Sequence, residues 1–258
     1  MSVRSSNHDR PPQPTVAAGA GSPEGAPVGL HVLPVAELGE IRAGDDIAWA
    51  IAGRAELCAG DVVVVTQKII SKSEGRLVPL DHDDPEDRRR VIESESVRVL
   101  RRRGDLMVCE TRHGFICANA GVDLSNVDDG WAALLPEDPD RSARRIRDAL
   151  RGVTGVEVGV VITDTFGRPW RKGVVDVAIG CAGVAAVVDL RGTSDAGGRA
   201  LTSTEVCVVD EIASAAELVM GKAAGVPVAV VRGVDPAYLR PGSVSEEVLR
   251  PPSEDLFR

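Results

Sequence analysis

The chain has 258 residues, 43% of them hydrophobic and 27% charged, which is usual for a globular protein with a substantial core. Its net charge of −9 and its 3% of aromatic residues argue against a nucleic-acid partner, which requires basic surface and stacking side chains. Because no apolar run approaches the roughly 20 residues of a membrane span and no signal-peptide core is present, we expect a cytoplasmic protein with no membrane partner. The five cysteines form no CxxC pair, which fits a reducing compartment.

The first half of the chain predicts a leader followed by short helices and strands. Residues 1–29 are rich in Pro, Gly, Ser and Ala, which predicts a disordered leader before an ordered domain at residues 30–258. A short helix is expected within "DDIAWAIAGRAEL" (45–57) and a buried strand at "DVVVV" (61–65). The segment "PEDRRRVIESESVRVLRRR" (85–103) predicts one amphipathic helix, and "DLMVCETRHGFICANAG" (105–121) two strands joined by a turn.

The second half alternates helices and strands less regularly. A helix ended by glycine is expected at 140–152, a buried strand at "VEVGVVIT" (156–163), and one or two strands with glycines at the bends in 175–192. Residues 202–227 predict one long helix, because Thr202 and Glu205 have the spacing of a capping box; a short strand followed by a helix from Asp210 fits less well. A final strand is expected at 226–233, and the tail from Asp235 is irregular. The order predicts a mixed α+β fold and not a doubly wound sheet.

Polar residues follow the strand at 61–65. The stretch "TQKIISKSEG" (66–75) gathers two ammonium groups with several hydrogen-bonding side chains, namely those of Gln67, Lys68, Ser71, Lys72 and Ser73. Lysines and backbone donors at the end of a strand suit phosphate oxygens. An exposed, solvated turn is the alternative.

A second candidate site lies in "NAGVDLSNV" (119–127). Asp123 and Asn126 are three residues apart, so they fit a Mg²⁺ or Mn²⁺ ligand beside a nucleotide contact. They fit equally an Asx-turn that closes a loop.

The stretch "VVITDTFGRPWRKG" (160–173) is the third candidate, because an apolar strand leads directly into an acid, two hydroxyls and then cations. Asp164 and Thr165 offer hard oxygen ligands for a divalent cation. Arg168, Arg171 and Lys172 would neutralise phosphate or carboxylate groups of the ligands. The alternative makes Asp164 a helix N-cap and the arginines ordinary surface.

The acidic residues at 205–211 and the glycine-containing motifs give weaker evidence for a functional site. Among Glu205, Asp210 and Glu211, the first two cap a helix, or one of the three completes a two-metal site with Asp123 and Asp164. Lys222 lies in "VMGKAAG", where alanine stands in place of the Ser or Thr of a P-loop, and no Rossmann fingerprint follows a strand. A nucleotide would therefore be held without a P-loop.

Four blocks of sequence together resemble a known family. They are "DVVVVTQKIISKSEGRLVPL", "GFICANAGVDLSNV", "VVITDTFGRPWRKGVVDVAIGCAG" and "LTSTEVCVVDEIASAAELVMGKAAGVPVAVVRG". Their order and spacing are similar to those of the coenzyme F420:L-glutamate ligases, also called gamma-glutamyl ligases. The resemblance runs from about residue 31 to the end of the chain.

The resemblance implies a reaction. Members of the family use GTP and divalent metal, Mg²⁺ or Mn²⁺ and two ions in all, to join L-glutamate to the deazaflavin precursor F420-0 and then to add further gamma-linked glutamates. A carboxylate is a poor electrophile, so the γ-phosphate of GTP would convert it to an acyl phosphate that the glutamate amine attacks. A monovalent cation such as K⁺ is a further expected cofactor.

The resemblance also implies roles for particular residues. Asp123 and Asp164 correspond to ligands of one metal, Thr165 to a ligand of a second, and Glu205 to a further ligand, the weakest of these transfers. Contacts to GTP are expected from Gln67, Lys72, Asn126 and the turn "LGEI" formed by Leu38, Gly39, Glu40 and Ile41. Asp164, Lys72, Arg168 and Arg171 are the residues expected to act in catalysis, the two arginines on charge alone.

The architecture that the family implies is a mixed α+β fold of two interlocked subdomains that works as a homodimer. Related actinobacterial proteins carry a C-terminal, nitroreductase-like FMN domain, which we expect this chain to lack because it ends at "PPSEDLFR". Two other functions compete with the ligase. One is a metal-dependent phosphohydrolase or nucleotidyltransferase, and the other is a regulatory module that binds a nucleotide or deazaflavin without catalysis.

Overall fold

A five-stranded sheet forms the centre of the computed structural model, which describes residues 29–125 and 127–255. The predicted leader (1–29) lies outside the described residues except for Gly29, and so does Asn126. The strand order is β1-β12-β2-β8-β9. The bounds are β1 His31–Val35, β12 Val228–Arg232, β2 Val62–Thr66, β8 Gly159–Arg168 and β9 Arg171–Ala182. Only β2 and β8 run parallel, so the sheet is mixed and is not a doubly wound sheet, and the fold is the mixed α+β class that the sequence predicts.

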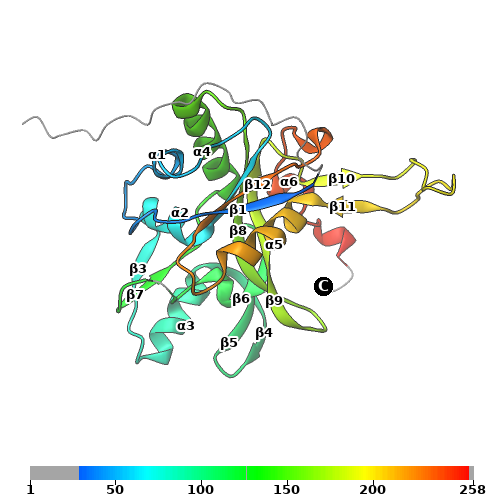
Figure 1. The fold of residues 1–258 in the computed structure, drawn as a ribbon. Helices are drawn as coiled ribbons and strands as arrows, with labels where there is room; N and C mark the ends of the chain where they lie inside the picture. Colours follow the sequence, from blue (N-terminus) through cyan, green and yellow to red (C-terminus); the bar gives the residue numbers. More distant parts are fainter. Residues whose placement is uncertain (1–28, 126, 256–258) are drawn as a thin grey trace, which may run out of the picture.

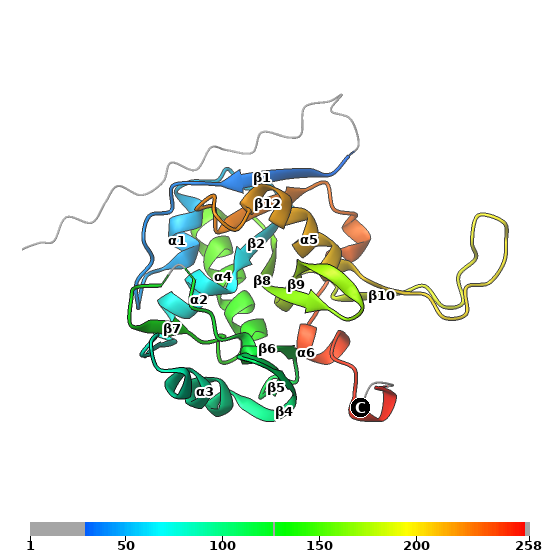
Figure 2. The same cartoon turned by 90° about the horizontal axis from the view of Figure 1, so that it is seen from below.

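Helices cover both faces of this sheet. The valines at 62–65 in β2 and residues 160–162 in β8 have no exposed surface, which explains why these segments read as continuous apolar runs. Helix α4 (Pro139–Thr154) packs on β8 and β9 from one side, and α5 (Val208–Met220) packs on β9, β1 and β12 from the other (Figures 1 and 2). Helix α1 (Ile47–Ala52) lies against α4.

The parallel pairing of β2 and β8 places two candidate segments side by side. Val62 is paired with Gly159 at one end of the two strands and Thr66 with Thr163 at the other. Helix α2 (Gln67–Ser73) begins directly after β2, while β8 continues past Thr163 and turns back into β9. The first turn of α2 therefore lies beside the second half of β8.

A smaller lobe has its own core. It contains α3 (Pro85–Ser94) and the antiparallel sheet of β4, β5 and β6 (Ser96–Arg103, Leu106–Thr111, Ile116–Ala118). Ile92, Met107, Cys109 and Ala120 form this second buried cluster. The short 3-10 helix η1 (Asn119–Gly121) follows β6, and strands β3 (Leu77–Pro79) and β7 (Trp131–Ala133) pair nearby. The two clusters fit the expected division into two parts.

A two-stranded ribbon extends from the body of the molecule (Figures 1 and 2). Its strands are β10 (Val187–Asp189) and β11 (Glu205–Cys207). After β12, the residues up to 255 form the short helices η2 (Pro236–Tyr238), α6 (Val244–Glu247) and η3 (Pro252–Glu254). Within the described ranges, none of the helices has the length and apolar character of a membrane span.

The start of α4 is anchored by a buried acid. Asp140 is 5% exposed and accepts five hydrogen bonds, from the backbone N–H groups of Cys181, Val244 and Ser245 and the hydroxyls of Ser243 and Ser245. These bonds join α4 to β9 and to α6. Gly180 permits the close approach, because a Cβ there would lie 2.4 Å from the backbone carbon of Pro139.

Several predicted elements are confirmed. They are the helix within 45–57, the strand at 61–65, the two strands within 105–121 and the final strand within 226–233.

Others are wrong because tertiary pairing overrides the local pattern. The helix predicted over 85–103 ends at Ser94, since the rest of that segment pairs with β5 as strand β4. The helix expected over 202–227 begins only at Val208, because residues 205–207 pair with β10. The alternative of a short strand followed by a helix is therefore closer to the structure, and Thr202 and Glu205 form no capping box at the start of the helix. Helix α4 passes Gly152 and is capped at Gly155, which has φ +72°.

Candidate functional site

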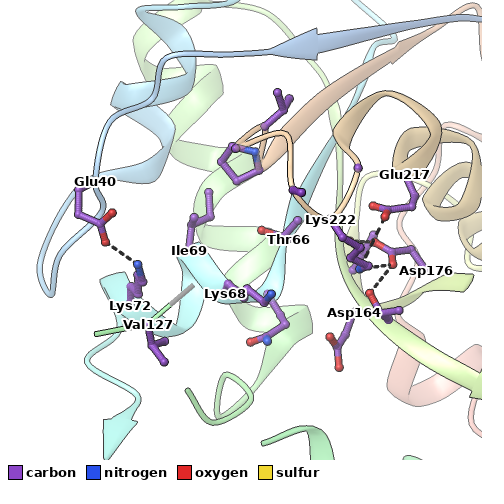
Figure 3. A pocket seen from close by; sticks show the side chains of 18 of the residues that line it. Glu40, Thr66, Lys68, Ile69, Lys72, Val127, Asp164, Asp176, Glu217 and Lys222 are labelled. Carbon is purple, nitrogen blue, oxygen red and sulfur yellow. Dashed lines mark hydrogen bonds and ion pairs between the residues drawn. The ribbon is translucent and has the colours of Figure 1, made fainter. Parts of the chain in front are cut away.

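A cavity of about 450 Å³ lies where β2 ends and β8 passes it. Figure 3 shows Lys72 and Glu40 on one side and Lys222, Asp176 and Glu217 on the other. Lys68 lies between these two groups. The lining includes five carboxylates and three ammonium groups, so the cavity is negative overall and attracts cations.

Helix α2 contributes donors to this cavity. The Gln67 side chain is 1% exposed, and its Oε1 accepts a hydrogen bond from Ser71 Oγ at 2.8 Å. Its Nε2 is buried with no hydrogen-bond partner among the described residues. A buried amide without an acceptor is costly, so this N–H₂ group is a candidate donor to a ligand. One turn later, Lys72 forms an ion pair with Glu40 at 2.5 Å.

Lys68 links α2 to the loop that carries Asp123. The Lys68 ammonium lies 3.0 Å from Asp123 Oδ2 and donates to Ser125 Oγ at 2.6 Å. Asp123 Oδ1 accepts from the backbone N–H and the hydroxyl of Ser125, which is the Asx-turn that the sequence left open as an alternative. The turn uses Oδ1 of Asp123 and leaves Oδ2 facing Lys68.

Asp164 lies on β8 and is half-buried at the cavity. Burial raises the pKa of this carboxyl to about 7; the N–H of Thr165 opposes the shift, and the negative charges of Asp123 and Asp176 add to it. Among the described residues, no side chain donates a hydrogen bond to the Asp164 carboxylate or forms an ion pair with it. Asp164 is thus an acid held near other acids, and the positive charge of Lys222 acts on it without forming an ion pair.

Asp176, Lys222 and Glu217 were not predicted as site residues. Asp176 on β9 is 1% exposed and accepts hydrogen bonds from Thr165 Oγ1 at 2.6 Å and Lys222 Nζ at 3.0 Å, both at Oδ1. Lys222 also lies 3.7 Å from Glu217. Two signals could have found the pair. Asp176 is the one acid in the apolar run 174–182, and Lys222 is one of only four lysines in the chain.

Comparison with known proteins identifies the family of this chain. The family model for F420-0:Gamma-glutamyl ligase matches residues 36–233. The chain belongs to this family. It is 42% identical over 251 residues to "Coenzyme F420:L-glutamate ligase" from Methanothermobacter thermautotrophicus, covering 90% of this chain and all of the relative. It is 45% identical over 246 residues to the protein of the same name from Methanopyrus kandleri, covering 89% and 98%.

This member of the ligase family brings many of the predicted site residues together. Glu40, Gln67, Lys72, Asp164 and Thr165 line the cavity. Asp123 is joined to it through Lys68, which is itself a lining residue.

Other predicted residues lie elsewhere. Leu38 and Ile41 of the predicted "LGEI" turn pack on the hydrophobic core, and Gly39 has a left-handed backbone with φ +75°. Glu40 is the one residue of this turn that lines the cavity. Arg168 and Arg171 lie at the turn between β8 and β9, outside the lining. Glu205 lies in the ribbon, 3.3 Å from Arg191.

The donor set fits one divalent cation in this ligase-family fold. Asp164 and Asp123 offer carboxylate oxygens, which Mg²⁺ and Mn²⁺ prefer, and the negative charge of Asp123 acts on Asp164. No group of three or more His, Cys, Asp or Glu in the described part of the chain is arranged to hold a metal by itself. Mg²⁺ commonly takes one or two carboxylates and completes its coordination with substrate phosphates and water.

Proposed function

We propose that this protein joins L-glutamate to the carboxylate of coenzyme F420-0, or of its dehydro form, and adds further gamma-linked glutamates, with GTP as the energy source. The observation that carries the proposal is the cavity itself. Its lining holds ammonium groups together with the Asp164 carboxylate, which no side-chain donor contacts among the described residues, and the unpartnered Nε2 of Gln67. Membership of the F420-0:gamma-glutamyl ligase family supports the choice of substrates.

The ammonium groups suit the charge that develops in this reaction. A carboxylate attacks the γ-phosphorus of GTP, GDP leaves, and negative charge spreads over the transferred phosphoryl oxygens. Lys68 and Lys72 approach from α2, and Lys222 approaches from the opposite side. Fixed cations that face the transferred group lower the barrier because they are already oriented before the reaction.

A divalent cation, when bound, would neutralise phosphate oxygens and hold GTP in line with the carboxylate. Asp164 and Asp123 are the residues that would hold it. The Lys68 ammonium now beside Asp123 would then be released toward the phosphates. The glutamate amine attacks the acyl carbon and loses a proton to solvent, the bond from that carbon to the phosphate oxygen breaks, and the amide and inorganic phosphate are formed.

The test is a product assay with the full chain. The chain is incubated with GTP, Mg²⁺ or Mn²⁺, L-glutamate and F420-0, while mass spectrometry follows the deazaflavin and chromatography follows GDP. Stepwise gain of glutamyl residues, matched by GDP and absent without metal, is the expected result. GDP release indifferent to glutamate would instead indicate a phosphohydrolase, and tight binding without turnover a regulatory module. Asp164→Asn is the matched inactive control.

A further inference from the structure

The hairpin of β8 and β9 continues beyond the central sheet as a two-stranded arm. Thr163 is the last residue of β8 that pairs with β2, and from Asp164 to Arg168 the pairing partner among the described strands is β9 alone. Figure 1 shows the end of this hairpin projecting from the body of the molecule. Asp164 therefore lies at the base of the arm, where it lines the cavity, and the turn of the hairpin lies at the far end.

The turn at the end of the arm exposes a tryptophan. Arg168 pairs with Arg171, so the two residues between them, Pro169 and Trp170, form the turn. Trp170 is 84% exposed, whereas the other two tryptophans of the chain are each 40% exposed. An indole has a large apolar area, so a ring that water surrounds at a projecting turn gains much by contacting a ligand.

The backbone of Trp170 adopts a conformation that a bulky side chain disfavours. Its φ is +58°, in the left-handed region. A turn with proline at its first central position and a left-handed residue at the second usually has glycine or asparagine there. Bulky residues in such a conformation are rare, and they are concentrated at binding sites and active sites. The turn itself therefore does not call for tryptophan, and a use for the side chain does.

Positive charge surrounds the indole. Residues 165–175 include three cations and no acid. Arg168 is used within the hairpin, because its Nη2 donates to the carbonyl of Lys172 at 2.8 Å. Arg171 and Lys172 are exposed, and within the described part of the chain neither forms an ion pair. In a protein of net charge −9, two unpaired cations beside an exposed ring favour an anionic ligand that carries a planar ring of its own.

The acceptor of the proposed ligase reaction has these features and a matching length. F420-0 carries a planar deazaflavin ring, which a ribityl chain and a phosphodiester separate from the lactyl carboxylate. About ten bonds join the carboxyl carbon to the ring, which is roughly 12 Å in an extended form. The four residues of strand from Asp164 to Arg168 span roughly 13 Å. A carboxylate in the cavity would therefore allow the ring to reach the turn.

We propose that the turn between β8 and β9 is a subsite for the deazaflavin of the acceptor, with Trp170 stacked on the ring and Arg171 and Lys172 paired with the phosphodiester. The inference rests on the proposed function, because it takes F420-0 or its dehydro form as the acceptor. Its new content is a residue outside the cavity that selects the acceptor by its planar ring.

Binding of F420-0 to the full chain, followed by the fluorescence anisotropy of the deazaflavin, tests the subsite. Trp170→Gly removes the indole and suits a φ of +58°, so it should weaken binding roughly 5- to 100-fold while Tm stays equal or rises. Trp170→Phe keeps an aromatic plane and should recover most of the affinity. Trp49→Leu, which removes a partly exposed tryptophan from α1, is the matched control and should bind F420-0 as the wild type does.

A second ligand separates the ring from the charges. The deazaflavin ribityl alcohol, which lacks the phospholactyl group, should lose affinity for Trp170→Gly by the same factor as F420-0 does. Arg171→Gln and Lys172→Gln should each weaken F420-0 roughly 2- to 5-fold at low salt and leave binding of the alcohol unchanged. Equal weakening of the two ligands in these variants would contradict the pairing with the phosphodiester.

The outcomes separate this inference from the function on which it rests. Unchanged affinity for F420-0 in Trp170→Gly would overturn the subsite, and so would a change in the sedimentation coefficient of that variant, which would make Trp170 a contact between subunits. Glutamate-dependent turnover by the wild type, measured in parallel, would leave the ligase function standing in both cases. A wild type that binds no F420-0 would overturn the subsite and the proposed function together.

Discussion

Gln67 Nε2, which has no hydrogen-bond partner among the described residues, gives a prediction in which stability and ligand binding move in opposite directions. Replacing Gln67 by methionine keeps the length of the side chain but removes both polar atoms. Ser71 loses one acceptor and keeps the other, the carbonyl of Leu134 at 2.6 Å, so its hydroxyl is not left unpaired. The variant therefore deletes a buried donor that has no partner and leaves no new one.

The magnitude follows from these contacts. A buried polar group without a partner costs about 1–3 kcal/mol, and the lost bond between Ser71 and Gln67 offsets roughly 1 kcal/mol of the gain. We expect the free energy of unfolding of Gln67→Met to stay equal or rise by up to about 2 kcal/mol. For a chain of this size, each 1 kcal/mol raises Tm by about 2–4 °C.

Nucleotide binding should change in the other direction. Loss of a hydrogen bond to a charged phosphate oxygen costs about 1.5–3 kcal/mol, which weakens GTP roughly 10- to 100-fold. The assay is thermal unfolding with and without GTP and metal, followed by calorimetric titration. Ser71→Ala is the matched control and should lower Tm while leaving GTP affinity intact. If Gln67→Met lost stability but bound GTP normally, Gln67 would be a structural residue and not a donor to the nucleotide.

Three other substitutions test the charge of the cavity and the packing of α4. Without metal, Asp164→Asn should be more stable than the wild type at pH 8, and the difference should vanish toward pH 4. The Asp164 carboxyl has a pKa of about 7 in the folded protein, so the wild type loses stability as the pH rises toward that value. Urea unfolding across this pH range measures the difference. Burial alone would raise the pKa of Asp140, but its hydrogen bonds hold the pKa below the usual value. Asp140→Ala should therefore cost at least about 3 kcal/mol at pH 7, and the loss should shrink as the pH falls below about 4; a loss independent of pH would contradict the role of the charge. Gly180→Ala should destabilise the protein strongly, since its Cβ would overlap the backbone of Pro139. Gly167→Ala has free space for its Cβ and should be nearly neutral in the same unfolding assay. Equal losses of stability in the two variants would contradict the close packing of α4 on β9.

The central part of the fold and site could be predicted because local sequence determines it. A run of four valines predicts a strand that is buried on both faces by covering helices. The polar residues that follow the run then lie where the strand ends. Asp164 and Lys72 were found in this way. The pattern does not show that the strand with Asp164 continues to Arg168, because β9 supplies the hydrogen bonds that extend it.

The residues that sequence reasoning missed depend on contacts between distant segments. Asp176 and Lys222 are 46 positions apart, and their ion pair exists only because α5 returns across β9. The same limit explains the misplaced helix at 85–103, where charged residues look amphipathic until β5 pairs with them. Glu205 matched an acidic ligand by type, yet pairing with β10 places it in the ribbon.

The central claim is that the cavity beside Asp164 activates a carboxylate with the γ-phosphate of GTP and couples it to glutamate. Oxygen-18 in the reacting carboxylate of F420-0 tests this directly, because an acyl phosphate passes one carboxylate oxygen to the released phosphate. The account predicts one labelled oxygen in phosphate for each first glutamate added, with one GDP formed. Phosphate free of the label, alongside normal product and GDP, would contradict it.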